Sequence, residues 1–163
     1  MVRAATRTDA KALGAFVLRA WKEAGPAALG FTGATDEAIR EISSEGFLAA
    51  RLASPKVKMV VAITGDEVVG FASLKAEDQE NVELSGIVVL QSESGRGVGT
   101  RLVRKSFALA RKLGYRTVRV KTEAFNRRAI GFYKKNGFTE TGKASERVGR
   151  TKVSLQVLQM TLR

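Results

Sequence analysis

The spacing of apolar residues along the chain predicts a mixture of strands and helices. Period-two and β-branched runs predict strands at 2–5, 56–63, 68–75, 82–90, 116–122, 138–147 and 152–162. Helical spacing predicts four helices, at about 8–23, from about 35–37 onward with no clear end, at about 98–112 and at 126–136. Gly25-Pro26 ends the first of these helices. The order β-α-α-β-β-β-α-β-α-β-β predicts an α/β fold with a mixed sheet flanked by helices.

Length and composition narrow the protein class. With 163 residues, 44% hydrophobic and 27% charged, the chain is expected to form one domain over 1–163 with a substantial core. Charged residues are scattered through the first twenty positions, so no signal peptide is predicted, and no apolar run is long enough to span a membrane. We therefore expect a cytoplasmic protein that does not act at a membrane.

The absence of two residue types restricts the possible chemistry. The sequence contains no cysteine and no histidine, which excludes disulfides, a cysteine nucleophile, a Ser-His-Asp triad and a Cys/His zinc site. No metal site is expected. Any general base must be a carboxylate, a tyrosine, a lysine, a chain terminus or an ordered water.

Charge is distributed unevenly between the two halves of the chain. Residues 1–80 hold 10 Lys/Arg and 11 Asp/Glu, whereas residues 81–163 hold 18 and 5. The basic half favours a polyanionic partner, for which nucleic acid, a membrane surface and a phosphorylated cofactor are the candidates, or else it is a solvated face. Nucleic acid is not expected, because the sequence lacks the interleaved exposed aromatics of single-strand binders.

A glycine-rich segment follows the predicted strand at 82–90. Gly95, Gly97 and Gly99 alternate at the start of the third helix, where the first-turn amides have no intrahelical acceptor and the helix dipole is positive. Such a loop can bind a phosphate or pyrophosphate, although a plain tight turn would also use glycine. Thr100 follows the last glycine, so the sequence matches neither the nucleotide-triphosphate loop nor the dinucleotide fingerprint.

Three segments in this order resemble the GNAT superfamily of acetyl-CoA-dependent N-acetyltransferases. They are the strand Ile87-Val88-Val89, the loop 94–99 (SGRGVG) and the segment 126–138 (NRRAIGFYKKNGF). The resemblance implies a GNAT-like mixed sheet flanked by helices and acetyl transfer from acetyl-CoA to a primary amine by direct attack in a ternary complex. One departure is Ser94, which occupies the position where the family's cofactor loop has Gln or Arg.

The resemblance also implies roles for particular residues. The pyrophosphate of CoA would be bound by the backbone of the loop Gly95, Arg96, Gly97, Val98, Gly99 and Thr100. Ile87, Val88 and Val89 would pair with the pantetheine arm like an added strand, with a strand amide near Val89 as the oxyanion donor. The candidates for the ribose phosphate are Arg96, Arg101, Arg127, Arg128 and Lys134.

Residues near the reacting atoms follow from the same resemblance. Asn126 would hydrogen-bond along the pantetheine arm, although it could simply cap a helix. Tyr133 would lie near the sulfur and protonate the leaving thiolate. Glu83 matches the glutamate base of histone-acetylating family members, with Glu123 or ordered water as alternatives.

Several questions remain open at the level of sequence. A non-catalytic acyl-CoA-sensing module of the same fold is the alternative to an enzyme, and the presence of both Glu83 and Tyr133 favours the enzyme. The acceptor could be a protein N-terminus, a lysine side chain, a polyamine or a small amine. A homodimer is possible.

Overall fold

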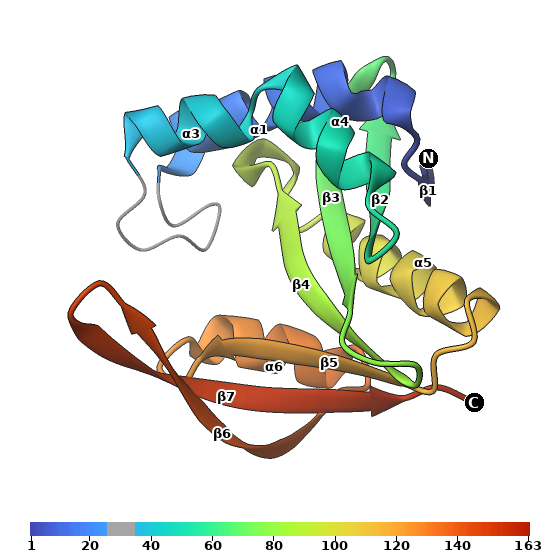
Figure 1. Cartoon of the computed structure of the whole chain (residues 1–163), viewed down its shortest axis with the longest axis vertical. Helices are drawn as coiled ribbons and strands as arrows, with labels where there is room; N and C mark the ends of the chain where they lie inside the picture. Colours follow the sequence, from blue (N-terminus) through green and yellow to red (C-terminus); the bar gives the residue numbers. More distant parts are fainter. Residues whose placement is uncertain (26–34) are drawn as a thin grey trace.

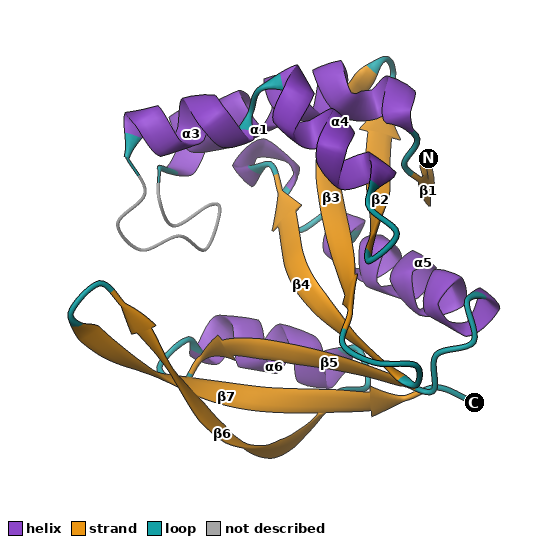
Figure 2. Ribbon diagram, in the orientation of Figure 1, coloured by secondary structure: helices purple, strands orange, loops and turns teal. Residues whose placement is uncertain are grey.

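The fold is built on one seven-stranded sheet. The computed structural model describes residues 1–25 and 35–163. The strands are β1 (Val2–Ala4), β2 (Val57–Thr64), β3 (Glu67–Ala76), β4 (Asn81–Val89), β5 (Thr117–Glu123), β6 (Thr139–Val148) and β7 (Thr151–Thr161). The α-helices are α1 (Ala10–Ala24), α3 (Asp36–Ile42), α4 (Glu45–Ala53), α5 (Val98–Lys112) and α6 (Arg127–Lys135). Short 3-10 turns, η1 (Arg7–Asp9) and η2 (Gln91–Glu93), precede α1 and follow β4 (Figures 1 and 2).

The sheet is mixed, as the sequence predicts. Its strand order is β1-β2-β3-β4-β5-β7-β6, and every neighbouring pair is antiparallel except β4 and β5. The parallel pair is joined by α5, because parallel neighbours need a crossover connection that antiparallel ones do not. The predicted α/β class with helices around a mixed sheet is confirmed.

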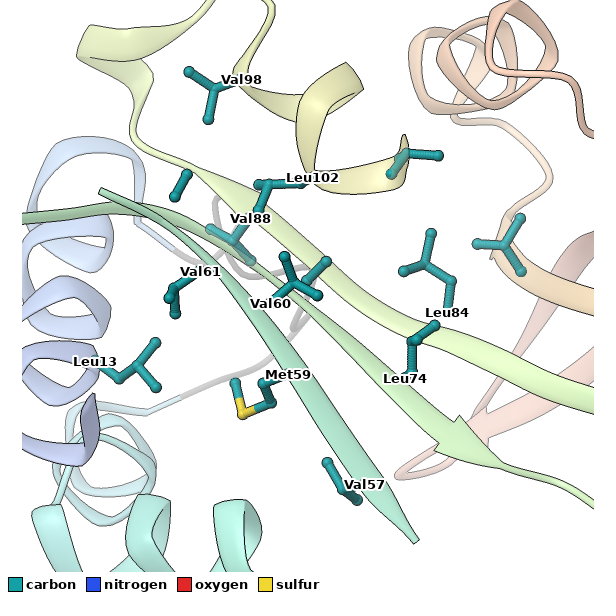
Figure 3. Packing of buried hydrophobic residues seen from close by; sticks show 14 of the residues in the cluster. Leu13, Val57, Met59, Val60, Val61, Leu74, Leu84, Val88, Val98 and Leu102 are labelled. Atoms are coloured by element: carbon teal, nitrogen blue, oxygen red, sulfur yellow. The ribbon is translucent and has the colours of Figure 1, made fainter. Parts of the chain in front are cut away.

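Helices cover both faces of the sheet. Successive residues Val60 and Val61 of β2 are both fully buried, so this strand is covered on each side (Figure 3). On one face Phe16 of α1 packs edge-to-face against Phe71 of β3, with ring centroids 5.7 Å apart. On the other face the fully buried Leu102 of α5 lies against the strands. None of the described helices combines the length and the apolar content needed to cross a membrane.

One local expectation is wrong. The predicted second helix is two helices, α3 and α4, separated at Ser43 and Ser44, and the Ser44 hydroxyl accepts a hydrogen bond from the Phe47 amide at 3.2 Å to begin α4. Three helices therefore stand between β1 and β2 in the described chain, where the sequence predicted two.

The end of α1 agrees with the sequence as far as it is described. Gly25 caps the helix with a φ of 61°, and its amide donates to the carbonyl of Trp21 at 2.8 Å. Pro26, the second residue of the predicted stop, lies outside the described residues.

Candidate active site

Strands β4 and β5 separate after a short parallel ladder. They pair only through Asn81–Thr117, Val82–Val118 and Glu83–Arg119, after which β4 continues to Val89 and β5 to Glu123 without pairing to one another (Figure 1). We call this region, 84–89 of β4 and 120–123 of β5, the β4–β5 fork. The backbone of β4 in the fork includes the predicted Ile87, Val88 and Val89, and its groups on that side have no partner strand. An extended ligand could pair with this edge as an added strand does.

A β-bulge at Ser85 sets which way the side chains of β4 point. Ser73 pairs with Gly86 but Leu74 pairs with Leu84, so Ser85 is an extra residue, and its hydroxyl donates to the Ser73 carbonyl at 3.2 Å. The register before the bulge places Leu84 opposite Leu74. The side chain of Glu83 therefore projects from the opposite face of the sheet from Leu84.

The identity of each face follows from contacts with α5. A Cβ on Gly70 would lie 3.1 Å from the Leu102 side chain and 3.4 Å from that of Val98, so Gly70 faces α5. Leu74 is four residues further along β3 and shares this face, as does its partner Leu84. Glu83 thus faces away from α5, on the side of the sheet covered by α1.

The glycine loop leaves a run of free amides beside the fork. Gly95 and Gly97 have φ of 79° and 77°, which favours glycine, and Gly97 is the N-cap of α5. The first bond into the helix is from the Arg101 amide to the Gly97 carbonyl at 3.1 Å. None of the six amides from Gly95 to Thr100 donates a hydrogen bond to a described residue. An anion bound at this helix N-terminus would accept hydrogen bonds from these amides.

Helix α6 approaches the same end of α5. A Cβ on Gly99 would lie 3.2 Å from the ring of Phe132, so only glycine allows this contact without displacing the ring. Phe107 of α5 also packs on Phe138, which follows α6, with ring centroids 5.4 Å apart. Helix α6 therefore covers the same face of the sheet as α5, opposite the side chain of Glu83.

Tyr133 on α6 is enclosed by aromatic rings. It is 8% exposed, and its ring centroid is 5.5 Å from those of both Phe132 and Phe138. Burial raises the pKa of Tyr133 to about 12, because the charged phenolate is poorly solvated there. Its hydroxyl makes no hydrogen bond to a described residue. The phenol is therefore neutral at physiological pH, with a proton available for donation.

The raised pKa predicts a loss of stability at high pH. The folded state holds the Tyr133 proton more tightly than the unfolded chain, so this stabilisation is complete below the ordinary value of 10 and is lost as pH rises toward 12. We expect the free energy of unfolding of the wild type to fall by up to about 3 kcal/mol more than that of Tyr133→Phe over this window. Chemical denaturation at pH 8 to 12 measures the difference. A parallel fall in both proteins would contradict the assignment.

Asn126 uses only part of its side chain within the protein. Its side-chain oxygen accepts a hydrogen bond from the Ala129 amide at 3.1 Å and caps α6. Its side-chain nitrogen donates to no described residue. The capping role expected as an alternative is present, and it leaves the amide donor free for a ligand.

The two candidate carboxylates lie on the same face of the fork. Val118 pairs with Val82 and shares the α5 face, so the alternating residues Arg119 and Glu123 face the other way, as Glu83 does. Glu83 stands opposite Arg119 where the fork begins, and Glu123 is four residues further, about 13 Å along the strand. Both are half-buried, and neither forms an ion pair with a described residue.

The cationic candidates differ in their surroundings. Arg96 lies 3.5 Å from Glu93, and Lys134 lies 3.3 Å from Glu140, so both are in ion pairs. Arg101, Arg127 and Arg128 are exposed and pair with no described carboxylate. Ser94 is exposed, and its amide donates to the Gln91 carbonyl at 3.1 Å.

Sequence reasoning missed two features of the site. The Glu23 carboxylate of α1 accepts hydrogen bonds from the Ser92 amide at 3.4 Å and the Ser92 hydroxyl at 3.3 Å, which ties the first long helix to the turn before the glycine loop. No local signal marks this contact, since the two residues are 69 positions apart. The bulge at Ser85 was also missed, although Gly86 inside a strand pattern is a signal for one.

Comparison with known proteins agrees with this architecture. The model of the acetyltransferase (GNAT) family matches residues 19–138. An uncharacterized N-acetyltransferase of Mycobacterium tuberculosis is 32% identical over 142 residues, which are 87% of this chain and 90% of the relative.

Solved structures share the fold at lower identity. A GNAT-family acetyltransferase of Streptococcus pneumoniae superposes with a TM-score of 0.77 at 22% identity, over 99% of this chain and 98% of that one. The PaiA N-acetyltransferase of Thermoplasma acidophilum, solved in complex with coenzyme A, has a TM-score of 0.73 at 18% identity, with 99% and 98% covered. Sequence and fold together establish that this chain belongs to the GNAT family of acetyltransferases.

Proposed function

We propose that this enzyme transfers the acetyl group of acetyl-CoA to a primary amine by direct attack within a ternary complex. The observation that carries this proposal is the position of the free loop amides, Gly95 to Thr100, at the end of an unpaired strand edge. Phosphates bound by these amides would let the pantetheine arm run along β4 from Val89 toward Glu83. Its amide groups would pair with the strand backbone, and Asn126 would donate to it from α6.

The general acid and the general base would then lie on opposite faces of the fork. Tyr133 approaches from the side of α5 and α6, so it is suited to protonate the departing thiolate. Glu83 is on the opposite side, so it is suited to accept a proton from the incoming amine, directly or through water. A β4 amide nearer to Glu83 than the Val89 amide that the resemblance implies would donate to the developing oxyanion, because the arm carries the thioester past Val89. The chain has no cysteine or histidine, so an acyl-enzyme intermediate on either of these residue types is excluded. This favours direct attack of the amine on the thioester.

The direction of the pantetheine arm favours Glu83 over Glu123 as the base. The acetyl end would lie toward the start of the fork, where Glu83 stands, whereas Glu123 is at its open end. Glu123 is therefore better placed to contact the body of the acceptor than its reacting amine.

Turnover with a panel of amines tests the proposed function. We expect release of the CoA thiol only when an amine is present, with one N-acetylated product formed per thiol released. The panel should include a protein N-terminal peptide, a lysine peptide, a polyamine and a small amine. Binding of acetyl-CoA without acetylation of any amine would instead support the acyl-CoA-sensing module.

Replacement of Glu83 tests the proposed base. We expect Glu83→Gln to lower kcat roughly 10²-fold at neutral pH and progressively less as pH rises toward about 10, where an alkylamine deprotonates unaided. A pH–rate profile measures this, with Glu146→Gln on β6 as the exposed-carboxylate control. A profile that overlays the wild type would reject Glu83, and the same loss in Glu123→Gln would transfer the role to that residue.

A further inference from the structure

Helix α5 presents a surface of one charge sign beyond the fork. Its fifteen residues include five arginines and lysines and no aspartate or glutamate. All five cations are exposed, and they recur along one face of the helix: Arg101, Arg104, Lys105, Arg111 and Lys112. The uncharged residue exposed among them is Ala108, which is small. We call these five cations the α5 basic stripe.

The charge of the stripe is not compensated within the described structure. None of its five cations lies within ion-pair distance of a described aspartate or glutamate, and residues 26–34 contain neither residue type. Arg111 donates to the main-chain oxygen of Arg163, the last residue of the sequence, at 3.1 Å, and the other four cations make no hydrogen bond to a described residue. Five like charges on one helix face repel one another, so an anionic partner would stabilise them.

The phosphates of CoA would not account for the whole stripe. The free loop amides are at the N-terminus of α5, and Arg111 is thirteen residues beyond Val98, about 20 Å along the helix axis. That length is about two Debye lengths at physiological ionic strength, so the pyrophosphate would interact weakly with this end of the stripe. Arg101 is the member of the stripe nearest the loop.

The side chains in and around the α5 basic stripe favour one class of polyanionic partner. The apolar side of α5 is buried in the core, with Leu102 and Val103 fully enclosed, so it is not available for insertion into a membrane. The stripe has no aromatic residue on which single-stranded bases could stack, and no apolar centre of the kind found in protein interfaces. A small residue between arginines and lysines suits close approach to a regular array of phosphates.

We propose that the α5 basic stripe binds the phosphate backbone of a nucleic-acid duplex without reading its sequence. The lack of interleaved aromatics argues against single-strand stacking, but it does not bear on backbone binding of this kind. The stripe and the fork are separate surfaces, so the enzyme could bind duplex and acetyl-CoA at the same time.

Fluorescence anisotropy with labelled RNA and DNA duplexes of about 20 base pairs, at about 50 to 200 mM salt, tests the proposal. We expect both duplexes to bind, with a slope of log affinity against log salt of about −4.5 if five phosphate contacts form. Saturating acetyl-CoA should weaken the affinity less than about tenfold, because Arg101 is the one cation of the stripe that is also a candidate for the ribose phosphate. Absence of duplex binding, displacement by acetyl-CoA, or binding to vesicles rich in anionic lipid in place of duplex would overturn the proposal.

Charge-reversal variants locate the binding surface. We expect Arg104→Glu with Lys105→Glu to weaken duplex binding at least about tenfold and to reduce the salt slope by about 2, while the KM for acetyl-CoA stays unchanged. The matched control is Lys11→Glu with Arg40→Glu, which makes the same change in charge at exposed positions on α1 and α3. Equal losses in the two variants would mean that net charge alone drives binding, and would contradict the assignment to α5.

Discussion

Tyr133→Phe is expected to cut kcat roughly 10²-fold with little change in the affinity for acetyl-CoA. The substitution removes the phenolic proton and keeps the ring, so the packing against Phe132 and Phe138 should persist. Burial raises the pKa of Tyr133 to about 12, so the phenol carries its proton through the range of any practical assay. Steady-state kcat together with calorimetric titration of acetyl-CoA measures the two effects separately.

A purely structural role for Tyr133 predicts a different pattern. If Tyr133 only packs, the Phe variant should turn over within about twofold of the wild type, whereas Tyr133→Ala should lower the thermal stability by opening the aromatic cluster. Melting curves for both variants provide the control. A Phe variant with near-normal kcat would reject the general-acid assignment and leave the family and the fold untouched.

Gly97→Val is expected to weaken acetyl-CoA binding by roughly 10²-fold or more, because losing two amide–phosphate bonds costs about 1.5–3 kcal/mol each. A Cβ at this position would meet no protein atom within 4 Å, so the substitution causes no clash in the free protein. The φ of 77° is unfavourable for a β-branched residue, however, and relief of that strain would turn the free amides away from a bound phosphate. Calorimetry with CoA measures the loss of affinity.

Gly65→Val is the matched control for this loop variant. Gly65 has a φ of 62° in the turn between β2 and β3, and a Cβ there would also meet no atom within 4 Å. It should therefore lose a similar amount of stability and keep full affinity for CoA. Gly99→Val is a poorer test, because its side chain would strike the Phe132 ring and disturb α6. Normal CoA binding by folded Gly97→Val would show that the loop is only a turn.

The sequence predicted those parts of the fold that depend on local patterns. Alternating apolar residues identified all seven strands, and the glycines at 95, 97 and 99 marked the start of α5 correctly. The split between α3 and α4 was not predictable from periodicity, since it depends on packing against α1. A Cβ on Gly14 of α1 would collide with the Ser43 carbonyl, so the junction of α3 and α4 packs directly against that glycine.

The candidate site was predictable in its members but not in their arrangement. Motif resemblance named Glu83 and Tyr133, yet the faces they occupy follow from the bulge at Ser85 and from the contact of α6 with Gly99. Both features depend on pairing between segments far apart in the chain. The sequence likewise did not indicate which group of Asn126 is free for a ligand. That follows from the hydrogen bond by which its side-chain oxygen caps α6.

Initial-rate kinetics with both substrates varied test the central claim most directly. Once an accepted amine is identified, direct attack in a ternary complex predicts double-reciprocal lines that intersect, because acetyl-CoA and the amine must occupy the fork together. It also predicts that acetyl-CoA alone leaves the intact mass of the protein unchanged. Parallel lines together with an acetylated protein that passes its acetyl group to the amine would contradict this account.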